Sequence, residues 1–429
     1  MAYFSAPALA GRAFLAPCFL TALVMAGGLL SHPAWATNGY FSNGYGAPAK
    51  AMAGAGVALG EGPLASAQNP ALGTAVGDVA GLCFTSFMPH RDITNEGVGG
   101  LKNGTYESEN DFFEIVCGGI NKTIDDKTSL GLLMFGNGGM NTEYETNVFS
   151  PGFGNGTSPL GVDLAQAFFS FNLAHKVADN VSIGVAPVLA VQRFKAYGLE
   201  MFAPMSTDSA KLTGQGYDWS YGGGFKLGVS WDALPWLSLG AAYQSRMWMS
   251  KFDKYSGLFA EQGDFDIPSF INEGIAIKPH RDWAILLEHQ RIFYEDVASL
   301  SNSHVRSATS LNLGSDDGAG FGWNNMDIFR LGVQWQALPS LTLRTGVSHA
   351  NEFTNGSETM FNILAPATPT THLSFGGTWH VNEQWALTGS YTHAFSHEIS
   401  GANSAMNASQ STTLRMDQDE LALGFSYRF

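Results

Sequence analysis

The sequence predicts an all-β protein, a 14-stranded antiparallel transmembrane β-barrel that is plugged by a small N-terminal hatch domain. Three observations support this fold class. The chain is 45% hydrophobic but only 14% charged, strand-like segments alternate apolar and polar residues, and short turns alternate along the chain with long polar loops. A strand with one face in lipid and one in a polar lumen averages to a hydropathy near zero, which fits the mean hydropathy of -0.01.

The first 36 residues have the features of a secretory signal peptide. Arg12 precedes an apolar run that ends at Leu30, and the segment closes with Ala34-Trp35-Ala36, the small-x-small pattern that signal peptidase cleaves. This pattern disfavours the alternative, an uncleaved membrane anchor. We expect a signal peptide over residues 1–36, a hatch over residues 37–78 and the barrel over residues 79–429.

Six short polar turns recur after the hatch, and each separates two alternating strand-like runs. Six hairpins with one strand before and one after them give fourteen strands, an even number as in bacterial barrels. In the last strand Leu421, Leu423 and Phe425 share one face, and Glu420 and Ala422 share the other. The turns lie at residues 125–127, 178–180, 232–235, 279–282, 336–339 and 381–383, and the long loops at 89–111, 195–216, 295–323, 351–368 and 397–415.

Aromatic residues mark the membrane boundary and the chain end. Five tryptophans beside the short turns are interpreted as the periplasmic aromatic girdle, with ordinary core tryptophan as the alternative. The chain ends on Tyr427-Arg428-Phe429, a pattern typical of the strand that the barrel-assembly machinery binds, so Phe429 is the expected contact with that partner. The tryptophans are Trp231, Trp236, Trp283, Trp335 and Trp385.

The net charge limits the classes of partner, and the cysteine content limits the possible disulfides. The net charge of -15 disfavours a nucleic-acid partner, which would need a basic surface. Two cysteines, Cys83 and Cys117, remain after the signal peptide in an oxidising compartment. If residues 79–88 and 112–121 form adjacent strands, the two thiols face each other. They either pair or stay free, because the pairing depends on geometry that the sequence does not show.

The segment from Thr37 to Asp78 differs in composition from everything that follows. It is rich in Gly and Ala, a helix is expected around Ala49 to Leu59, and it is too apolar for a solvated tail. A fourteen-strand barrel has a lumen wider than its own side chains fill, so this segment is expected inside as a plug.

Two motifs give a family resemblance. Gln68-Asn69-Pro70-Ala71-Leu72 looks like the end of the hatch in the FadL family of outer-membrane long-chain fatty-acid and aromatic-hydrocarbon channels, with Asn69, Pro70 and Ala71 as the hatch motif. The stretch from Leu133 to Tyr144 resembles the third-strand segment where the wall of that family is kinked, although Met134 stands where proline is often found. The kink residues would be Phe135, Gly136, Asn137, Gly138 and Gly139.

The resemblance implies a monomeric channel in the outer membrane of a Gram-negative bacterium, in contact with membrane lipid and lipopolysaccharide. Extracellular loops would capture a hydrophobic small molecule, which would leave sideways through the kink into the membrane. The glycines suit a break in the ladder, and a plain strand-end turn is the alternative. The ligand would be a long-chain fatty acid or, alternatively, an aromatic or alkane hydrocarbon.

Candidate ligand contacts follow from residue type. A loop with several large apolar residues is the expected capture surface, because such side chains are seldom exposed without a role; the alternative is that they form a small core under the loop. A fatty-acid carboxylate would need a cation in the lumen. The capture residues are Leu199, Met201, Phe202 and Met205, and the candidate carboxylate partners are Arg193, Lys195, Arg246, Arg330 and Arg344.

Other functions find little support. The sequence has no Gly-x-Ser-x-Gly, nucleotide-binding loop or paired-cysteine metal motif, so we predict no enzyme activity, no cofactor and no metal site. His393 and His397 are four apart but lack a helix and a companion glutamate. An outer-membrane lipase and a general diffusion porin remain as alternatives. A porin would need rings of opposed charge and a lumen free of a plug.

Overall fold

The structure is a computed structural model and describes residues 38–149, 156–305, 311–402 and 409–429. The expected signal peptide, residues 1–36, lies outside these ranges. No helix within them is long and apolar enough to cross a membrane.

A single antiparallel sheet closes on itself to form the barrel. The sheet has 16 strands, and without the short additions β2 (Gly104–Glu107) and β9 (Trp248–Met249) 14 remain. Each of these pairs with its neighbour in chain order, and the last pairs with the first, from Val79 opposite Arg428 to Gly97 opposite Gln410. The predicted fold class is confirmed. The barrel strands are β1 (Val79–Gly97), β3 (Phe113–Thr123), β4 (Thr128–Tyr144), β5 (Leu160–Ala178), β6 (Val181–Tyr197), β7 (Asp218–Leu234), β8 (Leu237–Gln244), β10 (Phe270–His280), β11 (Trp283–Ile292), β12 (Met326–Leu338), β13 (Leu341–Ala350), β14 (Thr371–His380), β15 (Trp385–Ala402) and β16 (Gln410–Arg428).

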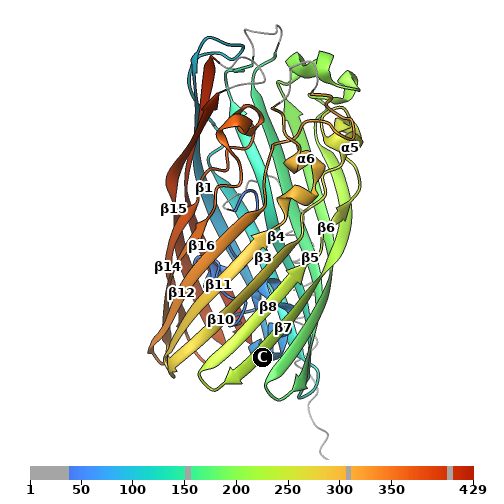
Figure 1. Cartoon of the computed structure of the whole chain (residues 1–429). Coiled ribbons are helices and arrows are strands. Elements are labelled where there is room, and N and C mark those ends of the chain that lie inside the picture. The colour runs from blue at the N-terminus through green and yellow to red at the C-terminus, as the bar shows by residue number, and fades with distance from the viewer. Residues whose placement is uncertain (1–37, 150–155, 306–310, 403–408) are drawn as a thin grey trace, which may run out of the picture. The chain divides into compact units, whose positions relative to one another are not determined.

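Short turns gather at one end of the barrel and long connections at the other. In Figure 1 the hairpin turns lie at the end that carries the C label, and α5 (Ala260–Gly263) and α6 (Ala298–Ser301) lie at the opposite end. The strands run further into the predicted loops than expected, with β1 reaching Gly97 and β15 reaching Ala402. Above the lipid both faces of a strand are polar, so the alternation that marks a strand in the sequence disappears there.

The two faces of the strands separate as predicted. Leu421 and Leu423 are 51% and 53% exposed on the outer face, whereas Glu420 and Ala422, which alternate with them, are buried in the lumen. All five tryptophans beside the turns are exposed, and Trp283 stacks on Trp335 with ring centroids 5.2 Å apart. This placement fits an interfacial girdle and excludes core tryptophan.

The hatch contains only short helices. They are α2 (Ala47–Lys50), α3 (Ala65–Gln68), the 3-10 turn η1 (Pro70–Leu72) and α4 (Gly73–Val76). The helix expected around Ala49 to Leu59 is wrong, because Ala53 and Gly54 have positive φ angles and the chain turns back there. The loops add η2 (Glu200–Met205), η3 (Ser209–Lys211), η4 (Asp253–Tyr255), η5 (Tyr294–Asp296), η7 (Gly356–Glu358) and α7 (Thr359–Asn362).

Candidate functional site: the hatch tip and the β3–β4 break

The ladder between β3 and β4 stops partway up the wall. The two strands pair from Thr123–Ser129 to Gly118–Met134, and β4 continues to Tyr144 with β5 as its only neighbour among the described strands. Over the same height β3 pairs only with β1. A β-bulge at Asn137 interrupts the β4–β5 register between Gly136 and Gly138. We call this interruption the β3–β4 break; it lies at the predicted kink residues.

The first described residues of the hatch cover the break from inside. Asn38–Ser42, here called the tip, pairs with the bulge: Ser42 N donates to Asn137 O at 2.8 Å, and Gly139 N donates to Tyr40 O at 3.0 Å. This contact needs glycine at position 138, because a Cβ there would lie 1.8 Å from Tyr40 O. The tip is therefore packed directly on the kink.

Aromatic side chains hold the tip in place. The Tyr40 ring lies 5.8 Å from that of Tyr294 and 6.0 Å from that of Trp323, both in extracellular connections. Burial raises the pKa of the Tyr40 hydroxyl, which therefore stays neutral. The tip thus contacts both the outer loops and the wall strand β4.

The rest of the hatch, residues 43–78, is called the body, and charged wall residues hold it. Lys50 Nζ lies 2.8 Å from Glu420, with both side chains buried. Glu288 accepts hydrogen bonds from the backbone N–H groups of Gly56 and Val57, at 2.8 Å each. Arg344 pairs with Glu61. The body is therefore fixed to the barrel at three separate places.

The hatch motif anchors the body between strands. The Asn69 amide donates to Val57 O at 2.8 Å and to Val229 O of β7 at 2.9 Å, while its oxygen accepts from Ala71 N. Gly228 leaves room for it, since a Cβ there would lie 2.0 Å from the Asn69 oxygen. Pro70 O accepts from Asn172 of β5 at 3.1 Å.

A disulfide lies next to the break. Cys83 of β1 and Cys117 of β3 are directly opposite in the register and bonded, with Cα atoms 4.9 Å apart. Gly118, the next residue, makes the last pair between β3 and β4. The disulfide therefore fastens β3 to β1 where β3 leaves β4.

The five candidate carboxylate partners are not free lumen cations. Arg330 pairs with Glu288 at 3.3 Å and Arg344 with Glu61, so both belong to the anchorage of the body. Arg246 pairs with Asp266 at 2.6 Å. Arg193 and Lys195 face outward, as described below, so their placement in the lumen is wrong.

Two lumen cations were missed by the sequence analysis. Arg91 of β1 is buried, its guanidinium donates to the carbonyls of Asn141 and Asn110, and its Nε finds no hydrogen-bond partner among the residues that the structure describes. Lys226 of β7 is buried, donates to Ala67 O at 2.8 Å and lies 5.1 Å from the ring centroid of Phe135. Within the described residues neither forms an ion pair. Counting alternate residues from the apolar outer positions of β1 and β7 would have placed both inside.

The expected exposure is wrong for three of the four capture residues, and the fourth, Met205, is half-buried against the same core. Leu199, Met201 and Phe202 are buried, and Phe202 packs on Phe149 and Phe361 with ring centroids 5.1 and 5.3 Å away. They form a core beneath the loops, which is the alternative that the sequence left open. These three side chains are therefore covered by the loop and do not form an exposed apolar surface.

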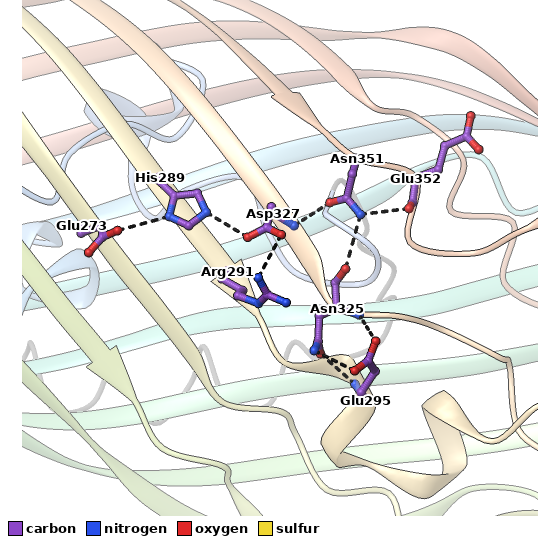
Figure 2. A network of polar contacts seen from close by, with 8 residues as sticks. All are labelled: Glu273, His289, Arg291, Glu295, Asn325, Asp327, Asn351 and Glu352. Carbon is purple, nitrogen blue, oxygen red and sulfur yellow. Dashed lines mark hydrogen bonds and ion pairs between the residues drawn. The ribbon is translucent and has the colours of Figure 1, made fainter.

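Cavities and polar networks complete the site. A cavity of about 20 Å³ beside the break is lined by Gly39, Arg91 and Met140, among others. On the outer wall, Glu273, His289, Arg291 and Asp327 form a polar network with loop residues (Figure 2). Among the described residues there is no group of three or more His, Cys, Asp or Glu side chains that could hold a metal.

Comparison with known proteins now gives the family. The family model described as outer membrane protein transport protein (OMPP1/FadL/TodX) matches residues 30–429. The chain belongs to this FadL/TodX family. Its members are outer-membrane channels of Gram-negative bacteria that transport hydrophobic compounds and are not enzymes.

Solved structures of FadL/TodX channels have the same fold. The toluene transporter TodX of Pseudomonas putida superposes with a TM-score of 0.68 at 16% identity, over 90% of this chain and 99% of that one. A Pseudomonas aeruginosa FadL homologue gives 0.67 at 15% over 91% and 100%, and the Ralstonia pickettii toluene transporter TbuX gives 0.65 at 18% over 90% and 99%. A search of curated protein sequences finds no match. At these identities the likeness shows the fold alone.

Proposed function

We propose that this FadL/TodX channel takes hydrophobic small molecules from the extracellular loops into the lumen and releases them sideways through the β3–β4 break. The observation that carries the proposal is the upper part of β4, which has no β3 partner among the described strands and has the hatch tip packed on its bulge. Movement of the tip away from Gly138 and Gly139 would uncover the break without unfolding a strand.

The anchorage of the body supports a lateral rather than a straight path. A route through the hatch would have to separate the buried Lys50–Glu420 pair and strip Glu288 of its two backbone donors. Removing one partner of a buried ion pair costs about 3–5 kcal/mol. The tip contains no charged side chain, so its displacement involves no such cost.

Lateral release also suits an apolar solute. The polar outer leaflet keeps such a molecule out, and transfer of its apolar surface from a wet lumen into hydrocarbon is favourable by roughly 25 cal/mol per Å². An exit that opens in the wall delivers it directly to that phase.

Two cations favour a ligand that carries a carboxylate, such as a long-chain fatty acid. Lys226 contacts Phe135 at the lower end of the β4 segment that lacks a β3 partner, and Arg91 contacts Asn141 higher on the same segment. A buried cation without a counter-charge is unfavourable, and an anionic head group passing the break would supply that charge. The alternative is a neutral hydrocarbon, the class to which the substrate named for the toluene transporters belongs.

Deletion of Asn137 tests the exit. This residue is the extra one in the β4–β5 bulge, so its removal should allow a continuous β4 that closes the break. We expect a folded, heat-modifiable barrel in which uptake of a radiolabelled long-chain fatty acid is lost. Deletion of Ser396, in the β15 bulge, is the matched control. Equal uptake by both deletion variants would contradict a lateral exit.

Substitution of the two cations tests the ligand class. Arg91→Gln and Lys226→Met should each reduce uptake of a long-chain carboxylate about tenfold, while uptake of the alkane of equal length stays unchanged. Arg415→Gln, on the outer face of β16, is the control. Mass spectrometry of the ligand that co-purifies in mild detergent should find a carboxylate; a neutral hydrocarbon would favour the alternative.

A further inference from the structure

Three basic side chains converge on Tyr217 at the extracellular end of the wall. The Arg193 guanidinium lies 4.5 Å and Lys195 Nζ 5.0 Å from the centroid of its ring, and Lys254 Nζ donates to its backbone carbonyl at 2.7 Å. We call Arg193, Lys195, Lys254 and Tyr217 the basic cluster. Such a concentration of cations is unusual in a chain of net charge -15.

The β6 residues of the cluster are on the lipid-facing side. Arg193 and Lys195 continue the alternation of the outer residues Leu189 and Val191, while Gln192 and Phe194 face the lumen. The apolar outer face ends at Val191, so the basic residues begin where the hydrocarbon ends. Trp219, which pairs with Arg193 in the β6–β7 register, is exposed at the same level, as expected at a membrane interface.

The cations of the cluster have unused hydrogen-bonding capacity. Arg193 is only 7% exposed, yet its Nε and Nη2 have no hydrogen-bond partner in the described part of the chain. Asp163 lies opposite Lys195 in the β5–β6 register, but its carboxylate accepts from the Tyr217 hydroxyl at 2.5 Å. Neither Arg193 nor Lys195 forms an ion pair with a described residue. Buried donors without acceptors leave room for a further partner, and an anion is one that suits a guanidinium.

A second group of polar side chains on the outer wall is arranged differently from the basic cluster. In the network of Figure 2, Arg291 lies 3.3 Å from Asp327, and His289 lies 2.9 Å from Asp327 and 3.4 Å from Glu273. Carboxylates of the neighbouring strands therefore lie beside both side chains, and Arg291 is paired with Asp327. In the basic cluster the nearest carboxylate, Asp163, accepts from the Tyr217 hydroxyl and acts electrostatically on Arg193 and Lys195, but within the described residues it forms no ion pair with either of them.

We propose that the basic cluster binds a phosphate group on the lipid anchor of lipopolysaccharide. At the upper edge of the apolar face the surrounding molecules are outer-leaflet lipids, and the phosphates of this glycolipid are the anions at that level. Arg193 supplies directional donors, and the two lysines supply mobile charge. The site lies on the outer wall and is separate from the lumen path.

Binding to defined lipids tests the assignment. The purified barrel is titrated in mild detergent with fluorescent lipid A that carries both phosphates, with the same lipid A after enzymatic dephosphorylation, and with phosphatidylglycerol. We expect Arg193→Gln with Lys195→Gln to bind phosphorylated lipid A at least tenfold more weakly than the wild type. Arg291→Gln, which removes one outward cation from the paired network, should bind as the wild type does.

Each outcome decides the proposal. Loss of affinity restricted to phosphorylated lipid A, with the variant barrel still heat-modifiable, supports it. Equal binding of dephosphorylated lipid A or of phosphatidylglycerol by the wild type would overturn the assignment, and so would wild-type affinity in the double variant. Fatty-acid uptake in whole cells, measured alongside, depends on the lumen and should remain unchanged by the double substitution.

Discussion

The body and the tip of the hatch are held by different kinds of contact. The body is fastened to the wall by the buried pairs Lys50–Glu420 and Arg344–Glu61 and by the Glu288 carboxylate. The tip has no charged side chain and contacts the wall through two backbone hydrogen bonds and a group of aromatic rings. Ionic anchorage is costly to break and position-specific, whereas ring packing tolerates displacement.

This difference indicates which part of the plug can move. Because the tip lies on the only part of β4 that lacks a β3 partner within the described strands, its movement changes access to the break. The body would stay in place and keep water from crossing. A single plug can in this way act as a barrier through its body and as a gate through its tip.

Breaking one anchor of the body should have the largest effect. Glu420→Ala leaves Lys50 buried without its carboxylate, and we expect a loss of about 3–5 kcal/mol in the free energy of unfolding. Single-channel conductance should rise, because the loosened body admits ions. Urea unfolding and planar-bilayer recordings measure the two effects.

A paired substitution separates lost attraction from lost packing. Lys50→Met combined with Glu420→Leu removes both charges at similar volume, so most of the stability and the low conductance should return. If Glu420→Ala alone leaves both properties unchanged, the body is not held by this pair.

Removal of the disulfide should have the next largest effect. It closes a segment with a sequence separation of 34, and the double substitution Cys83→Ser with Cys117→Ser should lower the free energy of unfolding by about 2–4 kcal/mol. Hydrogen exchange should increase over residues 113–117, which depend on β1 alone for pairing. Wild-type protein treated with reductant should behave in the same way, and the double variant should not respond to reductant. Protected amides at 113–117 in the variant would show that the bond does not hold this edge.

Displacement of the tip should cost less. Gly138→Val places side-chain atoms where Tyr40 O now lies, and overpacking of this kind costs about 1–3 kcal/mol. We expect the tip to detach while the body stays, so that sensitivity to hydrophobic antibiotics rises without an increase in ion conductance. Gly389→Val, at a wall position where a Cβ meets only the flexible end of Leu423, is the control. A variant that is as resistant as the wild type would exclude a gating role for the tip.

The strand count could be predicted from the sequence because its signals are local. Each polar turn and each alternating run lies within about ten residues, and the hatch stands out by composition. The anchors could not be predicted, since Lys50 and Glu420 are 370 residues apart and meet only after the barrel closes. Spacing in the chain carries no information about such pairs.

The side of the barrel wall on which Arg193 and Lys195 lie was predictable in principle, but the sequence analysis placed them on the wrong side. At the top of β6 the run Gln192-Arg193-Phe194-Lys195 puts two basic residues on the outer face and the apolar Phe194 on the lumen face, so hydropathy taken alone assigns the cations to the lumen. Counting every second residue from Leu189 assigns Arg193 and Lys195 to the outer wall. The burial of Phe202 depends instead on contacts with Phe149 and Phe361, which come from other loops.

The smallest expected effect concerns the loop that packs over the tip. Burial raises the pKa of Asp264 from 3.8 to about 6, and the like charge of Asp266 adds to this shift although Arg246 opposes it. The next residue, Phe265, packs on Tyr40 of the tip. A carboxyl whose pKa is higher in the folded state stabilises the fold below its unfolded pKa and loses that effect as the pH rises through about 6. Residues 250–268 should therefore be more resistant to proteolysis at pH 5 than at pH 7.5. The free energy of local opening of this loop should differ by roughly 1 to 2 kcal/mol after solvent screening. Asp264→Asn should abolish this pH dependence and Asp253→Asn, in the same loop but exposed, should keep it; a loop equally protected at both pH values in the wild type would show that Asp264 does not control the cover of the tip.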